Sequence, residues 1–336
     1  MSDVRPDPDP DPDPVRRGVL HAGAAAGLAR LLPSQAHAVV PPVDDATPLR
    51  IGFQKSAVNL LAVRQRALLA TRLPATPLKW VEFPAGPQLL EALAAGGIDF
   101  GFTGDSPPVF AQAAGREMLY VGVEPPKPAS SAILVPPSTA STGAAIRTLA
   151  DLKGRRLALQ KGSSAHWLAL RAVARAGLAW SDISPIYLAP ADARAAFERG
   201  ALDAWAIWDP YYAAAEIEGH ARVLATGQGL SDNHSFYLAS PALAARPAVL
   251  RALFAALTEA DAWVRANKAE ASHFIADVSG LPLATTIRFI ERRTSGPIGP
   301  LQPVHVASQQ AVADGFARAG LIPHPVRVAD AVWRPA

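Results

Sequence analysis

Apolar residues recur with two different periods along the first two-thirds of the chain, and the two periods alternate. Short runs such as Leu49–Phe53 and Ile98–Phe102 are largely apolar, as buried strands are, whereas 59–71 has the three- and four-residue spacing of a helix that faces a core. Regular exchange between these periods is typical of βαβ units. The pattern therefore predicts an α/β fold with mostly parallel sheets flanked by helices.

The same two periods place the other elements. The expected strands lie at 78–83, 119–123, 132–135, 156–160, 186–188, 202–208, 222–225 and 235–239, and the expected helices at 88–95, 109–114, 149–154, 164–176 and 190–199, with another beginning at Asp209-Pro210. Beyond these elements the pattern is mainly helical, and we expect helices at 242–245, 247–266, 268–279, 283–291 and 304–319.

The stretch from Ile98 to Pro108 contains a strand, a tight turn and a helix start in close succession. Gly104 permits close approach of a ligand to the backbone, and Pro107 and Pro108 suit the first turn of a helix. The free N–H groups of a helix start attract anions. Because Leu157–Trp167 repeats the arrangement, we expect two such starts at one cleft. Ordinary N-capping is the alternative interpretation of each start.

The composition of the chain limits the classes of ligand and of chemistry that it can support. The chain has 336 residues, 50% hydrophobic and 18% charged, which is enough for two domains with a substantial core. A net charge of +3 without a Lys/Arg run argues against nucleic acid and suits a small anion. The absence of Cys excludes disulfides and thiol chemistry, and the His residues lack metal-ligand spacing, so we expect no metal and no cofactor. No phosphate-binding Gly-x-x-x-x-Gly-Lys motif is present.

Residues 1–38 have the pattern of a targeting segment. Arg16-Arg17 is followed by an apolar stretch to Leu32 and by the small-x-small site Ala36–Ala38, which predicts a twin-arginine signal peptide over 1–38. A disordered tail is the alternative. An Asp-Pro repeat before Arg16 suggests that translation begins at Val15. Residues 39–48 are rich in Pro and are expected to form a linker.

Seven stretches of the chain resemble the aliphatic sulfonate-binding proteins of ABC importers, which are related to the taurine- and nitrate-binding proteins. The resemblance extends from about residue 49 to 335. It is carried by WVEFPAGPQLLEAL (80–93), GDSPPVFAQAAG (104–115), YVGVEPPKP (120–128), DLKGRRLALQKGSSAH (151–166), PADARAAFERG (190–200), DAWAIWDPYY (203–212) and SFYLA (235–239).

The resemblance implies a two-lobed periplasmic binding protein of type II, which closes about a hinge on its ligand. Lobe 1 would comprise 49–128 plus 238–336, and lobe 2 would comprise 129–237. The implied role is capture of a sulfonate between the lobes and its delivery to a membrane permease with a cytoplasmic ATPase, for sulfur acquisition. We expect a monomer that acts in the periplasm. We do not expect an enzyme. Without a Cys it would not be lipid-anchored.

A sulfonate is ionised at physiological pH, so its oxygens need several converging donors. His166 is either such a donor or an exposed helix-start residue. Trp208 and Tyr237 are expected to line the pocket along the aliphatic tail, Trp205 to lie in the core, and Asp209 to cap its helix. The candidate ligand-binding residues are Gln54, Thr103, Gly104, Asp105, Gly162, Ser163, Ser164, His166, Trp208, Asp209 and Tyr237.

Two other interpretations stay open. Taurine, nitrate, a sulfate ester or an aromatic sulfonate would suit the same kind of protein. A serine hydrolase is the more distant alternative, because Gly104-Asp105-Ser106 is similar to the nucleophile block of one hydrolase family. That family also needs Asp-x-x-His near the C-terminus, which this chain lacks, and no Gly-x-Ser-x-Gly motif occurs.

Overall fold

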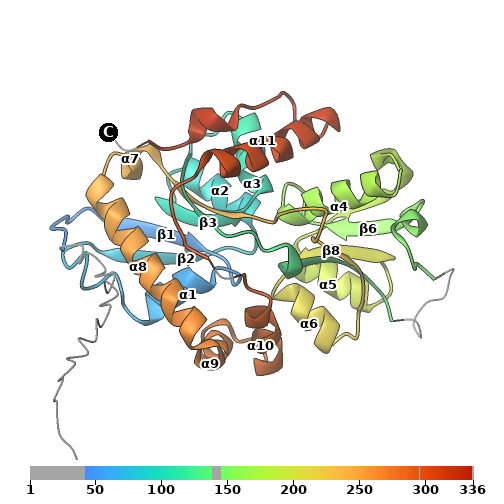
Figure 1. The fold of residues 1–336 in the computed structure, drawn as a ribbon, viewed down its shortest axis with the longest axis horizontal. Coiled ribbons are helices and arrows are strands. Elements are labelled where there is room, and N and C mark those ends of the chain that lie inside the picture. The colour runs from blue at the N-terminus through green and yellow to red at the C-terminus, as the bar shows by residue number, and fades with distance from the viewer. Residues whose placement is uncertain (1–41, 138–144, 295, 335–336) are drawn as a thin grey trace, which may run out of the picture. The chain divides into compact units, whose positions relative to one another are not determined.

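The computed structural model describes residues 42–137, 145–294 and 296–334 (Figure 1). The predicted signal peptide over 1–38 and the proposed start at Val15 lie outside this part of the chain. Among the described residues no helix is long and apolar enough to cross a membrane.

The first of two five-stranded sheets has the order β2-β1-β3-β10-β4. Only β10 runs against its neighbours, which places Ser235 opposite Gly104 of β3 and opposite Glu124 of β4. The strands are β1 (Leu49–Phe53), β2 (Leu78–Glu82), β3 (Phe100–Gly104), β4 (Leu119–Glu124) and β10 (Ser235–Ala239).

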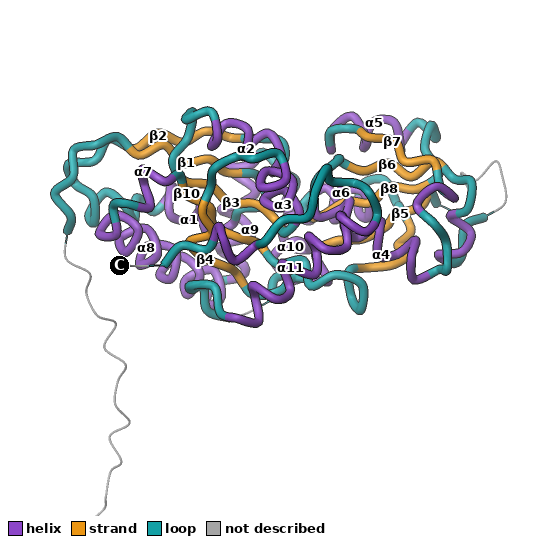
Figure 2. The backbone as a smooth tube through the Cα atoms, turned by 90° about the horizontal axis from the view of Figure 1, so that it is seen from above, coloured by secondary structure: helices purple, strands orange, loops and turns teal. Residues whose placement is uncertain are grey.

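Helices cover both faces of the first sheet because its central strands are apolar on both sides (Figures 1 and 2). One face packs against α1 (Val58–Gln65), α8 (Pro247–Ala266) and α9 (Lys268–Ser279). The other packs against α2 (Gly86–Ala94), α3 (Ser106–Ala113) and α11 (Pro303–Arg318). The short α7 (Pro241–Ala244) follows β10.

The second sheet has the order β7-β6-β8-β5-β9, and only β5 is antiparallel to its neighbours. Helix α4 packs on one face, and α5 and α6 pack on the other. The strands are β5 (Ser131–Val135), β6 (Arg156–Leu159), β7 (Ser184–Tyr187), β8 (Ala204–Trp208) and β9 (Arg222–Thr226), and the helices are α4 (Ser164–Arg175), α5 (Pro190–Glu198) and α6 (Tyr211–Ile217).

Two connections join the sheets, one between β4 and β5 and one between β9 and β10. They are hydrogen-bonded to each other: Lys127 N donates to Asp232 O at 2.9 Å, and Asn233 Nδ2 donates to Lys127 O at 2.9 Å. Asn233 has a φ of 50°, a left-handed conformation that Asn tolerates better than most residues. A third contact comes from α10 (Leu283–Glu291), which follows α9 and packs beside α6 (Figure 1).

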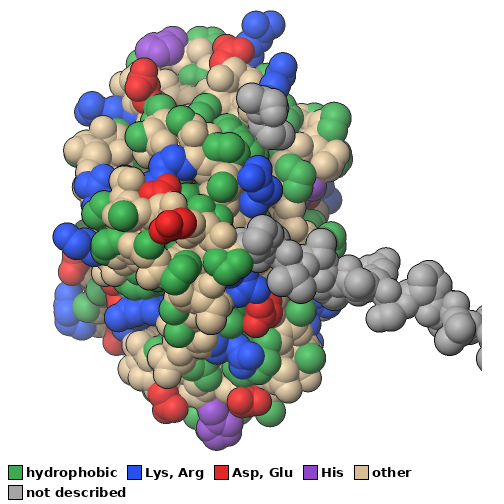
Figure 3. All heavy atoms as spheres, turned by 90° about the vertical axis from the view of Figure 1, so that its left-hand side faces the viewer, with side chains coloured by type: hydrophobic (Ala, Val, Ile, Leu, Met, Phe, Trp, Pro, Cys, Tyr) green, Lys and Arg blue, Asp and Glu red, His purple; other side chains and the backbone are tan. Residues whose placement is uncertain are grey.

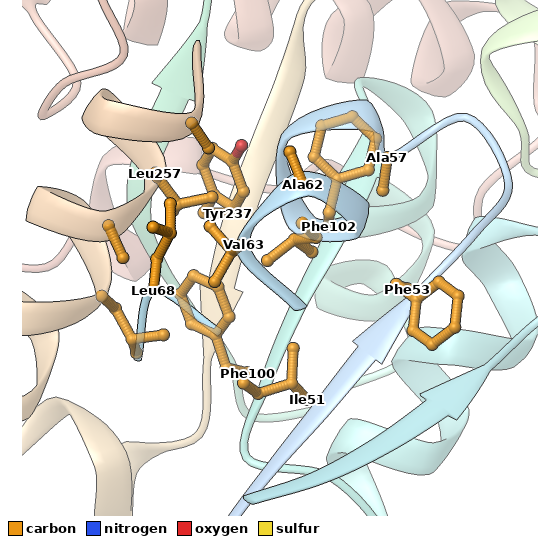
Figure 4. Packing of buried hydrophobic residues seen from close by; sticks show 14 of the residues in the cluster. Ile51, Phe53, Ala57, Ala62, Val63, Leu68, Phe100, Phe102, Tyr237 and Leu257 are labelled. Atoms are coloured by element: carbon orange, nitrogen blue, oxygen red, sulfur yellow. The ribbon is translucent and has the colours of Figure 1, made fainter. Parts of the chain in front are cut away.

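The core of the first sheet is apolar and aromatic (Figure 4). Phe100 and Tyr237 stack with ring centroids 5.6 Å apart and an interplanar angle of 11°. In the second sheet Trp205 is completely buried, as predicted. Each sheet thus has apolar clusters on both faces, and the cluster between the first sheet and α11 also includes Trp167 of α4.

The predicted α/β architecture, with two lobes and mostly parallel sheets, is confirmed. The helix expected over 59–71 is shorter: α1 ends at Gln65, and Ala67 then adopts a left-handed φ of 49°, which no helix can continue. The described part of the expected linker, 42–48, lies against the first core. There Val43 N donates to Arg72 O, and Arg246 forms an ion pair with Asp45 at 2.8 Å.

Candidate functional site

A pocket of about 50 Å³ lies where the two sheets and their connections meet. Its walls come from the carboxyl ends of β1, β3 and β8, from the starts of α2, α3 and α4, and from the region around α10. The lining residues are Gln54, Ser56, Gly86, Phe102, Gly104, Pro107, Lys127, Ser130, Ser163, Ser164, Trp208, Asp209, Asn233, Ser235, Phe289 and Arg293. Carboxyl ends of strands are where α/β folds collect ligands.

The end of β3 and the start of α4 approach each other closely in this pocket. A Cβ placed on Gly104 would lie only 1.9 Å from Ser164 Oγ. The absence of a side chain at Gly104 therefore allows the start of α4 to come this near. The first turn of a helix also leaves backbone N–H groups without partners inside the helix. The Ser164 hydroxyl at this helix start lines the pocket and also hydrogen-bonds the carboxyl group of Asp105.

Two cationic side chains line the same pocket, and neither was among the residues predicted from the sequence. Lys127 is paired with the buried Glu124 at 2.6 Å. Arg293 Nη2 donates to Asn59 Oδ1 at 3.2 Å and lies 3.8 Å from Asp261 Oδ1. The cations come from the connection after β4 and from the chain after α10, so only the tertiary fold brings them together. The location of Lys127 within the resembling stretch 120–128 was the available signal.

Glu124 accepts several hydrogen bonds behind the part of the pocket that Lys127 and Arg293 line. Its Oε1 accepts from Tyr237 Oη at 2.7 Å and from Asn59 Nδ2 at 2.8 Å. Burial by itself would raise the pKa of Glu124, but the charges of Lys127 and Arg293 and the hydrogen bonds outweigh it and hold the pKa at about 2. Glu124 is therefore ionised at neutral pH and fixes Lys127 at the pocket.

Six of the predicted site residues line the pocket: Gln54, Gly104, Ser163, Ser164, Trp208 and Asp209. Gln54 Nε2 donates to Phe102 O at 2.9 Å, which holds the amide at the end of β1. Ser163 Oγ donates to Gln160 O at 2.7 Å, whereas Asp209 Oδ1 accepts from Ala213 N at 3.0 Å. The expected capping role of Asp209 is consistent with that bond, although α6 itself begins at Tyr211.

The other predicted residues do not line the pocket. Thr103 Oγ1 donates to Gly104 O at 3.0 Å, and Gly162 N donates to His166 Nδ1 at 3.2 Å. Tyr237 is completely buried in the first core (Figure 4). Its hydroxyl donates to Glu124. Asp105 is buried next to the pocket and accepts from Ser106 Oγ at 2.9 Å.

His166 differs most from what the sequence suggested. Its ring is completely buried and lies near the rings of Phe110, Trp180 and Phe316. Burial, with a smaller contribution from the charge of Lys161, lowers the pKa of His166 to about 3. The imidazole is therefore neutral and is not an exposed helix-start residue.

The sequence profile of the NMT1-like family matches residues 44–278. The alkanesulfonate-binding protein from Xanthomonas axonopodis pv. citri, solved with MOPS bound, has 48% sequence identity and a TM-score of 0.82 over 87% of this chain and 100% of that chain. The periplasmic aliphatic sulphonate binding protein from Escherichia coli has 46% identity and a TM-score of 0.78 over 86% of this chain and 92% of that chain.

A more distant relative is the taurine-binding periplasmic protein of Escherichia coli strain K12, which is 28% identical over 50% of this chain and 54% of its own length. The names of the first two proteins state that they bind alkanesulfonate and aliphatic sulphonate, and the name of the third states that it binds taurine. The profile match covers more than half of the chain, and the two solved structures align over most of it. The chain therefore belongs to the NMT1-like family, together with these sulfonate-binding proteins.

Proposed function

We propose that this chain is the extracytoplasmic solute-binding component of an ABC importer and that it captures aliphatic sulfonates in the pocket described above. The observation that carries the proposal is the convergence of Lys127, Arg293 and the start of α4 on one pocket. This convergence occurs in a chain 46–48% identical to solved sulfonate-binding proteins.

The pocket offers what a sulfonate head group needs. Its volume of about 50 Å³ has room for roughly three to five atoms of water size, which suits one sulfur and three oxygens. Charged donors come from Lys127 and Arg293, and a neutral donor from the Ser164 hydroxyl. Phe102, Trp208 and Phe289 contribute the apolar part of the wall, which an aliphatic tail would contact.

The alternative ligands differ in how well they match the charged and apolar side chains of the pocket. Nitrate has no tail for the aromatic side chains, and taurine adds an ammonium group beside the two cations of the wall. Sulfate esters and aromatic sulfonates share the head group. The hydrolase interpretation loses support because Ser106 is completely buried and its hydroxyl is bonded to Asp105. The close relatives are binding proteins, and the chain is accordingly not an enzyme.

We also propose a hinge between two bodies of the chain. We take 49–128 plus 238–336 as one body and 129–237 as the other, with the two hydrogen-bonded connections as the bending points. Because β10 begins at Ser235, the second body would end just before it rather than at 237. Closure would bring Ser163, Ser164 and Trp208 towards the ligand held by the first body.

We also propose export by a twin-arginine signal peptide and a periplasmic location without a lipid anchor. The protein would act as a monomer that delivers its ligand to a membrane permease served by an ATPase. On the face seen in Figure 3, Lys and Arg of the described residues lie among apolar and acidic side chains rather than in a basic stripe. That distribution does not favour nucleic acid as a partner.

A thermal-shift screen tests the ligand class. The mature chain is heated in phosphate buffer with C2–C8 alkanesulfonates, taurine, sulfate or nitrate; buffers that are themselves sulfonates are avoided, because one relative was solved with MOPS bound. A ligand at 100 times its Kd stabilises the folded state by about 2.7 kcal/mol, so the alkanesulfonates should raise the Tm. A shift with nitrate and none with any sulfonate would overturn the proposal.

A further inference from the structure

Asp209 is a buried acidic residue in the wall of the pocket. It directly follows β8, its backbone N–H donates to Ser130 O at 2.9 Å, and its side chain lines the pocket. It is only 2% exposed. A carboxyl group at this place is unexpected, because an ionised carboxylate repels the anion that the rest of the pocket attracts.

The two oxygens of Asp209 have different surroundings. Oδ1 accepts from Ala213 N at 3.0 Å and from Arg292 Nη1 at 3.1 Å. Oδ2 is buried and has no hydrogen-bond partner among the described residues. A bare carboxylate oxygen is costly to bury, whereas a protonated one can donate a hydrogen bond. Oδ2 is thus the oxygen at which Asp209 would bind a proton.

The neighbouring charges only partly compensate Asp209. Arg292 also bonds Glu216 of α6 and stacks 3.7 Å above the ring centre of Tyr212, so its charge is shared. Arg288 lies beside Glu216 on the same side. The pocket itself adds the cations Lys127 and Arg293, whose carboxylate partners are Glu124 and Asp261. Burial raises the pKa of Asp209 to about 7, although Arg292 and the N–H of Ala213 act to lower it.

We propose that Asp209 takes up a proton from solvent when the anion enters the pocket, so that its carboxyl group no longer repels the ligand and can donate a hydrogen bond to it. The proton binds at Oδ2, no bond of the ligand changes, and a sulfonate has no proton of its own to supply. This inference rests on the proposed function. It makes Asp209 a residue that sets the pH range in which aprotic anions bind.

Titration calorimetry with ethanesulfonate tests the inference in the wild-type chain. The buffers are phosphate, imidazole and Tris, which contain no sulfonate and differ in ionisation enthalpy. At pH 8 the buffer dependence should show uptake of close to one proton per bound sulfonate, and at pH 5.5 it should show almost none. The Kd should weaken about tenfold per pH unit above pH 7. A Kd that is flat from pH 5.5 to 8.5, without proton uptake, would overturn the inference while leaving sulfonate binding intact.

Four variants identify the carboxyl group. Asp209→Asn should remove both the proton uptake and the pH dependence. Arg292→Gln should move the onset of weakening to higher pH, because loss of the cation raises the pKa of Asp209. Asp277→Asn, an exposed residue of α9, should keep the wild-type profile. Asp105→Asn examines another buried carboxyl group beside the pocket, whose pKa burial raises to about 6.

The outcomes separate the inference from the function it rests on. If Asp105→Asn abolishes the proton uptake and Asp209→Asn retains it, the inference is wrong. If the wild-type chain binds no sulfonate at any pH, the proposed function is wrong and the inference falls with it. The wild-type calorimetry and the direction of the Arg292→Gln shift remain decisive if Asp209→Asn does not fold.

Discussion

At the scale of single residues, the unusual feature is the number of charges buried at the pocket. The side chain of Glu124 is 2% exposed and that of Lys127 is 11% exposed, and each charge would be costly alone. Their contact at 2.6 Å, with Tyr237 and Asn59 bonded to the same carboxylate, makes the pair tolerable. Such a pair fixes the direction of the Lys127 ammonium group. A fixed ammonium group helps an anion site bind its ligand more than it helps the folded state.

Replacing Glu124 by Gln should therefore destabilise the protein strongly. The change leaves the buried Lys127 without its partner, for which we expect a loss of about 3–5 kcal/mol in the free energy of unfolding, measured by urea denaturation. Glu117→Gln, at an exposed position near the same strand, is the matched control and should change little.

The Glu124 substitution also has a pH signature. The folded pKa of about 2 lies below the usual 4.5, so the stabilisation by Glu124 is present above pH 4.5 and is lost as the pH falls towards 2. The wild-type stability should drop more steeply over that range than the stability of Glu124→Gln. Equal slopes for the two proteins would show that Glu124 is not held ionised by its neighbours.

At the scale of elements, periodicity was sufficient to predict most of the fold. The helices and strands lie close to their expected positions because burial on one or both faces imposes a local pattern. The helix expected over 59–71 was too long because nothing in the residue type of Ala67 signals its left-handed conformation. The antiparallel direction of β5 and β10 depends on where the chain crosses between sheets, which a local pattern does not record.

The site could be predicted only in part for the same reason. Gly104 and Ser164 were found because strand ends and helix starts are recognisable in sequence. Tyr237 was expected at the pocket but lies in the core, because the side-chain alternation within β10 directs it towards Phe100 and Phe102. Lys127 and Arg293 were missed because they are distant in sequence and meet only after folding.

The approach between β3 and α4 gives a prediction at this scale. In Gly104→Ala the new Cβ would lie 1.9 Å from Ser164 Oγ, so either the Ser164 hydroxyl must rotate away or the start of α4 must shift, and sulfonate binding should weaken at least tenfold in calorimetry. In the double variant Gly104→Ala/Ser164→Ala the nearest atom of residue 164 is Cβ at 3.3 Å, which relieves most of the clash.

The double variant separates the clash from other effects. It should bind more tightly than Gly104→Ala, even though it lacks the Ser164 hydroxyl. Gly299→Ala, where an added Cβ meets nothing within 4 Å, is the control and should bind as the wild type does. Unchanged affinity in Gly104→Ala would mean that the two elements do not enclose the ligand.

At the scale of the whole molecule, the two sheets are joined by connections that are bonded to each other, by the packing of α10 against α6, and by contacts of His166 and Trp167 of α4 with Phe316 of α11. We propose that the two bodies move relative to each other without either sheet unfolding, as a protein that opens to load and to release its ligand requires. The pocket residues come from both bodies, so binding and closure are expected to be coupled.

Calorimetric titration of ethanesulfonate into the wild-type chain and into Ser164→Leu, at pH 6 in phosphate, tests the central claim most directly. We predict one sulfonate bound per wild-type chain with a Kd near micromolar, about −8 kcal/mol, and a loss of at least a hundredfold in Ser164→Leu, because the bulky side chain fills the pocket at the start of α4. No binding by the wild type, or wild-type affinity in a folded Ser164→Leu protein, would contradict the account.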